Sequence, residues 1–176
     1  MATGTVATFE ESLERLDVDW TRTAAATVES TIDELVEPPA VGVGLGDDLG
    51  LPTSVGLDPT PADLREAKTG VTKASLAVAD YGSLVLESTP DGAEQVGLFP
   101  DLHVAVLHES DIVGDMQAAF EWLGPRLRAD GEDGKSAILA TGPSATADMG
   151  SLVRGAHGPK EVHVVVVVSD REGDDE

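Results

Sequence analysis

The sequence predicts an α/β protein, specifically a three-layer α/β/α domain built on a mostly parallel sheet. Several expected strands are continuous apolar runs, such as VHVVVVV over residues 162–168, and such runs are typical of strands that a parallel sheet buries on both faces. Expected helices alternate with these strands along the chain, which favours the same layered class. The chain has 176 residues, of which 41% are hydrophobic, and this suits one domain with one core.

Residues 1–39 are predicted to form an N-terminal helical segment. Thr8 and Glu11 match a capping box at the start of an amphipathic stretch over residues 9–16. A second helix is expected over residues 24–36, because apolar side chains recur there at helical spacing and two prolines follow.

Residues 40–169 are predicted to form the α/β core, and residues 170–176 an acidic tail. Short apolar runs predict strands over residues 40–45, 83–87, 102–107, 136–140 and 162–168. Helices are expected over residues 61–68, 71–79, 112–123 and 147–154, with a polar connection over residues 125–134. Since ligands of such folds bind beyond the carboxyl ends of parallel strands, a site is expected in the loops that follow the strands.

The charge is the strongest compositional feature. Acidic residues outnumber basic ones 33 to 11, which gives a net charge of −22. A cytosol of very high salt explains this excess best, because a Debye length of about 3 Å in molar salt screens the mutual repulsion. A nucleic acid is not expected as a partner, because little here would neutralise its phosphates.

Three absences in the sequence narrow the class of protein further. No apolar run reaches the roughly 20 residues of a membrane helix, and the acidic N-terminus lacks the features of a signal peptide. The protein is therefore expected in the cytoplasm, with no membrane partner. The chain has no cysteine, which excludes disulfides, thiolate nucleophiles and iron–sulfur clusters held by this chain.

A turn rich in hydroxyl groups over residues 141–148 is the first candidate site. It follows one expected strand and leads into the expected helix at 147–154. Free amide groups at a helix N-terminus, together with the hydroxyls of Ser144 and Thr146, would suit a phosphate or carboxylate. The alternative is that Thr146 only caps the helix.

A second candidate is the run GAHGP over residues 155–159. Gly155 is expected to end the preceding helix. His157 has small neighbours that offer it little packing, so it is a candidate for hydrogen bonding to an anion or for acid–base catalysis. The alternative is a structural histidine that bonds a loop carbonyl.

A third candidate lies around the strand at 83–87. Gly82 permits a close approach of the backbone to a ligand, and Ser83 and the upstream Thr72 supply hydroxyls. Glu87, at the end of an apolar strand, is a second candidate catalytic group; the alternative is a solvated strand end.

Other motifs are weak. The sequence has no G-x-S-x-G elbow, and its histidines lack the spacing of a metal site, so no metal is expected. His103 and His163 lie in expected strands and are interpreted as structural. The glycine run at 42–46 resembles a dinucleotide-binding loop only loosely.

Four stretches of the chain resemble the LUD (lactate utilisation) domain family in its LutC-like short form. They run from GVTKA to GSLVL over residues 70–86, FPDLHV over 99–104, SDIV over 110–113, and from TGPSATAD to GAHGP over 141–159. The resemblance implies one LUD domain over residues 1–176. It also implies the fold of the group that contains ribose-5-phosphate isomerase, glucosamine-phosphate deaminase and the CoA transferases (NagB/RpiA/CoA transferase-like).

The resemblance further implies a subunit of a system that oxidises L-lactate to pyruvate and binds a small anionic metabolite. The implied partners are two iron–sulfur proteins (LutA- and LutB-like), so clusters are expected only in partner proteins and no cofactor in this chain. The candidate ligand-binding residues are Thr72, Gly82, Ser83, Gly142, Ser144, Thr146, Asp148, His157 and Gly158.

Two departures from the family bear on activity. The family usually has an arginine where this chain has Ala145, and another near the positions of Glu94 and Gln95. Losing both would weaken an anion site. The cations that could replace them are Lys73, Arg154 and Lys160.

The sequence leaves two other functions open. One is a free-standing enzyme acting on a small phosphorylated or carboxylated metabolite, and the other is an anion-binding module without catalysis. Whether the chain is an enzyme and whether it forms a homo-oligomer also stay open.

Overall fold

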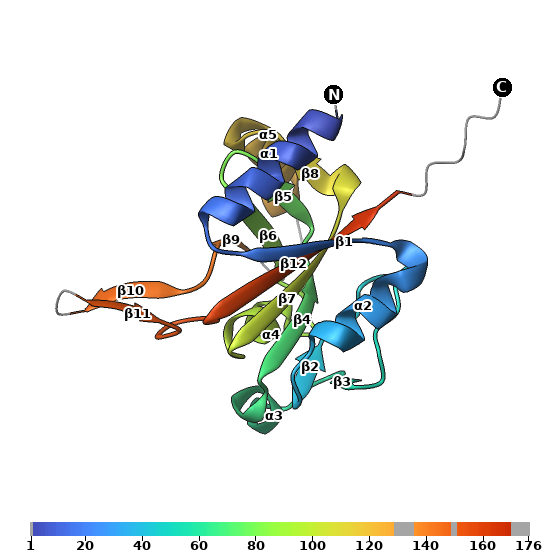
Figure 1. Ribbon diagram of the computed structural model, residues 1–176, viewed down its shortest axis with the longest axis vertical. Coiled ribbons are helices and arrows are strands. Elements are labelled where there is room, and N and C mark those ends of the chain that lie inside the picture. Colours follow the sequence, from blue (N-terminus) through green and yellow to red (C-terminus); the bar gives the residue numbers. More distant parts are fainter. Residues whose placement is uncertain (1, 129–135, 149–150, 170–176) are drawn as a thin grey trace.

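A six-stranded parallel sheet forms the centre of the molecule (Figure 1). The computed structural model describes residues 2–128, 136–148 and 151–169. The strands of the sheet, in spatial order, are β1 (Asp19–Ala24), β12 (Glu161–Val168), β7 (Leu102–His108), β4 (Thr69–Lys73), β2 (Ala40–Gly42) and β3 (Val55–Gly56). Every neighbouring pair is parallel, so the predicted α/β class with a mostly parallel sheet is confirmed.

The central strands explain the continuous apolar runs. In β12, Val164, Val165 and Val166 are all fully buried, although successive side chains point to opposite faces of the sheet. Both faces must therefore be covered, and full burial of each such valine stabilises the fold by roughly 1.5–3 kcal/mol.

Different elements cover the two faces. On one face, α2 (Val28–Leu35) follows a short 3₁₀ turn, η1 (Ala25–Thr27), and packs Val28 and Ile32 on the sheet. The opposite face is covered by α1 (Ala2–Arg15), by α4 (Ala93–Leu98) and by a second sheet. A further short helix, α3 (Pro61–Glu66), packs beside α4, and a capping box between Thr60 and Asp63 begins it.

The second sheet was not predicted from the sequence. Its strands, in spatial order, are β8 (Ile112–Val113), β5 (Leu76–Val78), β6 (Ser83–Glu87) and β9 (Ala137–Thr141). Strand β6 is antiparallel to both of its neighbours. Phe9 and Leu13 of α1 pack with both sheets, and α5 (Met116–Arg128) packs Ala119 and Leu123 on the far side of the second sheet.

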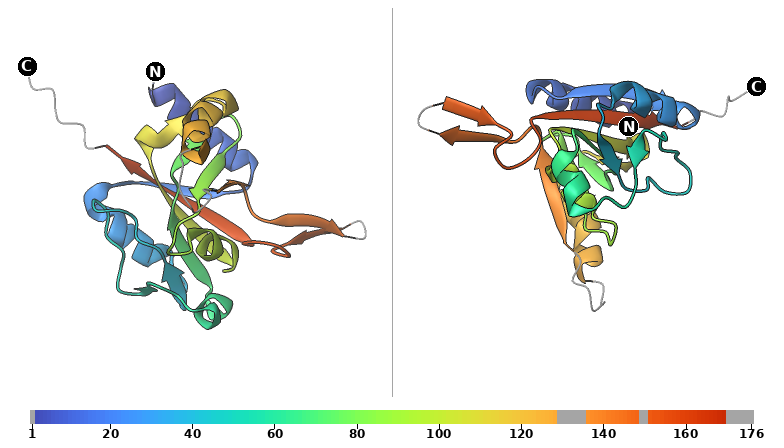
Figure 2. Two further views of the ribbon diagram at one scale, coloured as in Figure 1. Left: turned by 180° about the vertical axis from the view of Figure 1, so that it is seen from behind. Right: turned by 90° about the horizontal axis from the view of Figure 1, so that it is seen from below.

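A two-stranded antiparallel hairpin projects from the body of the molecule (Figure 2). It consists of β10 (Ala145–Asp148) and β11 (Ser151–Arg154). At its base, the Ser144 N–H donates to the Pro159 carbonyl at 2.8 Å, and the Gly155 N–H donates to the Ser144 carbonyl at 2.9 Å. The helix predicted over residues 147–154 is therefore wrong, and Gly155, with a φ of +77°, turns the chain at the hairpin base instead of ending a helix.

Other predictions for secondary structure need correction. Residues 71–79 contain the end of β4 and all of β5, not a helix, because burial in both sheets overrides their helical pattern. Thr8 is inside α1, where its hydroxyl donates to the Gly4 carbonyl, so it does not cap the helix. The supposedly helical residues 1–39 also contain β1, which extends the central sheet beside β12.

Several boundaries differ as well. The expected strand at 40–45 ends at Gly42, and the expected helix at 112–123 is β8 followed by α5. Helix α5 takes up the first part of the polar connection predicted over 125–134; residues 129–135 and the acidic tail 170–176 lie outside the described residues. Among the described helices, none combines the length and the apolar composition needed to cross a membrane.

Candidate functional site

A cavity of about 440 Å³ lies between the two sheets. Its walls are the inward-facing side chains of β6 and of the central strands, closed by the end of α1. These wall residues are almost fully buried, and they include Leu13, Leu84, Leu86, Val162 and Val164. The cavity therefore has a fixed, apolar interior.

The rim of the cavity brings together residues from three separate loops. Gly82 lies between β5 and β6, Gly142 and Ser144 lie between β9 and β10, and His157 lies between β11 and β12. Two further candidate residues predicted from the sequence also line the cavity, Thr146 and Gly158. Six of the candidate binding residues thus share one cavity, although they are up to 76 positions apart in the chain.

Two of these loops turn through left-handed glycines. Gly82 has a φ of +63° and Gly142 a φ of +67°, a backbone region that side chains with a Cβ rarely adopt. Both glycines also lie against Leu16 at the end of α1, where a Cβ at Gly82 would come within 2.9 Å of the Leu16 side chain. These positions hold the rim close to the body of the domain.

The expected anion site at a helix N-terminus does not exist in this form. Residues 145–148 and 151–154 pair as antiparallel strands, so none of these residues offers free helical amides to the cavity, and the Ser144 amide is already bonded to Pro159. The donors left at the rim are the hydroxyls of Ser144 and Thr146 and the ring of His157. His157 is exposed, whereas Ser144 and Thr146 are half-buried.

A second histidine, His103, lies in the buried wall. It is 2% exposed, and its Nε2 lies 2.8 Å from the Thr72 hydroxyl on the neighbouring strand β4. Burial lowers the pKa of His103 to about 4, so the imidazole is neutral near pH 7. The interpretation of His103 as a structural histidine agrees with the hydrogen bond at Nε2. The sequence did not indicate that His103 lines a cavity.

Three predicted residues do not line the cavity. The hydroxyl of Thr72 points to His103, and the Ser83 hydroxyl lies 2.7 Å from that of Thr141, which does line it. Asp148 ends β10, and its side chain lies outside the described part of the chain. These hydroxyls therefore support cavity residues from behind.

The two catalytic candidates are not part of one site. His157 lines the cavity, but Glu87 lies at the far end of β6, where it pairs with Ala137, and is absent from the lining. The structure therefore gives no support to Glu87 as a catalytic group of this cavity.

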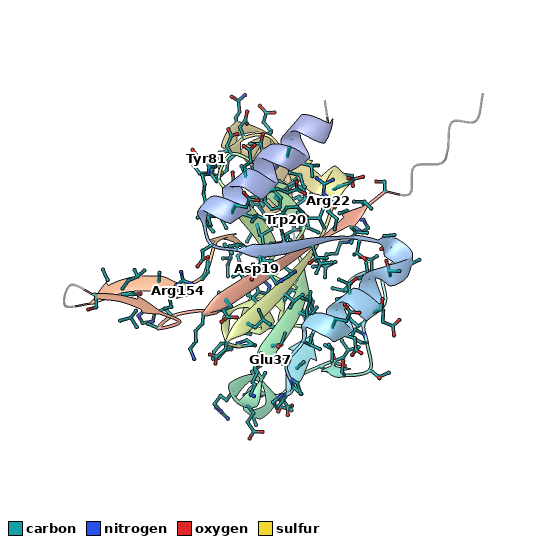
Figure 3. All side chains as sticks on the ribbon, in the orientation of Figure 1. Asp19, Trp20, Arg22, Glu37, Tyr81 and Arg154 are labelled. Carbon is teal, nitrogen blue, oxygen red and sulfur yellow. The ribbon has the colours of Figure 1, made fainter. Side chains whose placement is uncertain are left out.

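No lysine, arginine, aspartate or glutamate lines the cavity, as far as the described residues show. Arg154, on the hairpin (Figure 3), pairs with Asp17 at 2.8 Å, and Lys160 pairs with an Asp101 carboxylate oxygen at 2.9 Å. Lys73 is the last residue of β4, at the carboxyl ends of the parallel strands and beside Gly46. None of the three cations replaces the missing arginines in the cavity.

The positions of those arginines are also clear. Ala145 lines the cavity at the start of β10, so an arginine there would reach the rim. Glu94 is outside the cavity, where it accepts a hydrogen bond from Ser136. With Ala145 at this position, the rim has no cationic side chain there.

The cavity does not lie where the fold class alone predicts. His103 and Val162 are the second residues of β7 and β12, so the cavity is on the face of the sheet near the amino ends of the parallel strands. The expectation of a site beyond the carboxyl ends is wrong for this cavity. The second sheet and the hairpin enclose this space, and neither was predicted from the sequence.

The chemistry of the site is that of a pocket for an organic molecule. Its volume is within the range of about 300–1,000 Å³ that small-molecule sites occupy, and its lining is mainly apolar with a few neutral donors. In the described part of the chain, no three histidine or acidic side chains gather as metal ligands would.

Comparison with known proteins finds a match to one domain family over more than half of the chain. Residues 59–167 match the LUD domain. The chain is 32% identical over 109 residues to "Lactate utilization protein C" of Deinococcus radiodurans, a match that covers 60% of this chain and 49% of that protein. It is 37% identical over 108 residues to the protein of the same name from Bacillus licheniformis, covering 60% and 44% respectively.

These matches span about half the length of the curated relatives or less. A crystal structure of a DUF162 family protein from Deinococcus radiodurans superposes with a TM-score of 0.73 at 20% identity, over 96% of this chain and 99% of that one. At this identity the likeness concerns the fold.

Proposed function

The chain belongs to the LUD domain family, and we propose that it is a LutC-like component of a lactate utilisation system that binds a small organic acid anion. The observation that carries this proposal is the cavity between the sheets. Its rim residues, from Gly82 to Gly158, all fall inside the region that matches the family.

The lining of the cavity suits an anion despite the acidity of the chain. No acidic residue of the described part of the chain lines it, so a bound carboxylate meets no negative charge from these residues at the wall. The rim supplies hydrogen-bond donors, the hydroxyls of Ser144 and Thr146 and the ring of His157. A carboxylate can accept hydrogen bonds from all three groups.

The redox step is assigned to partners. Oxidation of L-lactate to pyruvate releases two protons and two electrons, and a chain without cysteine holds no iron–sulfur cluster to accept the electrons. In this proposal the chain binds the acid, and two iron–sulfur proteins of the same system carry the electrons.

Calorimetric titration with L-lactate and with pyruvate tests the proposal. We expect the double variant Ser144→Ala/Thr146→Ala to bind the preferred acid about thirtyfold more weakly, because two rim hydrogen bonds that contribute about 1 kcal/mol each are lost. Its melting temperature should not change, because both side chains are only half-buried.

The matched control is Ser151→Ala, which removes an exposed hydroxyl from the same hairpin outside the cavity. This variant should bind like the unmodified chain. Equal affinity of the double variant and the unmodified chain would contradict the proposed site, and oxidation of lactate by the chain alone would contradict the division of roles.

A further inference from the structure

His103 presents one ring nitrogen to the protein and the other to the cavity. Nε2 pairs with the Thr72 hydroxyl, and no partner for Nδ1 occurs among the described residues. No buried side-chain nitrogen or oxygen of the described part lacks a partner, so Nδ1 must reach open space. Because His103 is otherwise buried and lines the cavity, that space is the cavity.

Thr72 determines which nitrogen carries the ring hydrogen. Its hydroxyl is fully buried, and His103 Nε2 is the acceptor that the described structure offers it. If Nε2 carried the hydrogen, the hydroxyl hydrogen would be left without an acceptor in the core, which is unfavourable. The hydroxyl therefore donates to Nε2, and the neutral ring carries its hydrogen on Nδ1.

The described neighbours of the His103 ring are uncharged. Gly97 of α4 lies against the ring and also against Leu86 of β6. Val162 of β12 is the register partner of His103, and Thr72 is the neighbour from β4. Gly97 lies so close that a Cβ there would be 3.3 Å from Nε2. The ring is thus held in one orientation in a medium where a hydrogen bond is stronger than in water.

We propose that His103 is a ligand-binding residue, whose Nδ1–H donates to the oxo oxygen of an aliphatic 2-oxo acid in the cavity. This rests on the proposed function and deepens it by naming the inner donor and the class of acid. A ketone oxygen only accepts hydrogen bonds, whereas the hydroxyl group of a 2-hydroxy acid also needs an acceptor for its own hydrogen, which the leucine and valine side chains of the wall do not provide. The site therefore favours a 2-oxo acid over the corresponding 2-hydroxy acid.

The walls indicate an acid longer than pyruvate. Leucine and valine side chains from both sheets line the space of about 440 Å³, and a three-carbon acid would leave most of it empty. Each methylene that enters such a wall strengthens binding by about fourfold, from about 0.8 kcal/mol per buried CH₂. Affinity is expected to rise from pyruvate to 2-oxohexanoate.

The test compares 2-oxohexanoate with 2-hydroxyhexanoate by calorimetry on the full chain. The unmodified protein should bind the oxo acid about tenfold more tightly. In His103→Gln the amide can still meet Thr72 at the position of Nε2, but the donor at Nδ1 is lost, so the preference should disappear. In the matched variant His103→Asn, an amide remains near the position of Nδ1 and part of the preference should persist.

A second measurement uses only the unmodified protein and so does not depend on whether a variant folds. The ¹⁵N shifts of the His103 ring in the unmodified protein report which nitrogen is protonated, and we expect hydrogen on Nδ1. Hydrogen on Nε2 would overturn the inference whatever ligand binds.

The outcomes separate the two proposals. Equal oxo-acid binding by the unmodified chain and His103→Gln would overturn the role of His103 and leave the cavity as the binding site. If neither six-carbon acid binds, and lactate and pyruvate also fail, then the proposed function fails together with this inference.

Discussion

The two sides of the cavity are built from different kinds of structure. The wall consists of strands in the centres of two sheets, and its side chains, such as Leu86 and Val164, are 1% exposed or less. Most of the rim belongs to the base of a projecting hairpin (Figure 2), and His157 and Ala145 are exposed there. Substitutions in a wall of this kind lower the stability of the fold, whereas substitutions at the rim can alter ligand binding and leave the fold intact.

The largest expected effect concerns a leucine of the wall, and a leucine of the hairpin outside the cavity lining is its control. Leu86→Ala should lower the free energy of unfolding by about 3 kcal/mol, because it opens a cavity in a packed core. Leu152→Ala should change it by less than about 0.5 kcal/mol, because Leu152 on the hairpin is 67% exposed. Urea unfolding at constant salt measures both, and similar losses would contradict the distinction between wall and rim.

The second prediction concerns pH and the wall histidine. The pKa of His103 is lowered to about 4 in the fold and is near 6.5 in the unfolded chain, so the unfolded chain binds more protons between these values. This contribution to stability is present above pH 6.5 and is lost as the pH falls toward 4. Between pH 7 and pH 5 the loss amounts to about 2 kcal/mol.

The variant His103→Gln isolates this contribution. His163, whose pKa burial also lowers, and all the carboxylates titrate in both proteins, so their effects cancel in the difference. From pH 7 to pH 5 the unmodified chain should therefore lose about 2 kcal/mol more stability than the variant. Parallel stability curves would show that His103 is not buried in its neutral form.

The smallest expected effect restores a cation at the rim. Ala145→Arg should strengthen pyruvate binding by about fivefold, because an exposed charge-assisted hydrogen bond contributes about 1 kcal/mol. Ala147→Arg adds the same charge to the same strand at a residue outside the cavity lining and serves as the control. Stability should hardly change in either variant, and equal gains from both would mean that net charge, not the site, governs binding.

Sequence reasoning succeeded where burial leaves a strong local pattern. Strand β12 is buried on both faces, so its run of valines has no other interpretation than an inner strand. It failed for residues 71–79 and 147–154, which are short strands with helix-like spacing. Their conformation depends on pairing, of β5 with β6 and of β10 with β11. Such pairing joins residues that are not local in the sequence, so the local pattern does not predict it.

The same limit applies to the site. Glycines, hydroxyls and a histidine between small residues mark the rim, and the sequence analysis found them. The wall is made of ordinary apolar residues, and His103 meets Thr72 only because β4 and β7 are neighbours in the sheet. The one sequence signal was a histidine inside an apolar strand, which was interpreted as structural.

A crystal structure of the chain soaked with 2-oxohexanoate tests the central claim most directly. We predict density for the acid between the two sheets, with its oxo oxygen within hydrogen-bonding distance of His103 Nδ1 and its carboxylate toward Ser144 and Thr146. Density beyond the carboxyl ends of β2 and β4, beside Gly46 and Lys73, or a cavity that stays empty of the acid at saturating concentration, would contradict it.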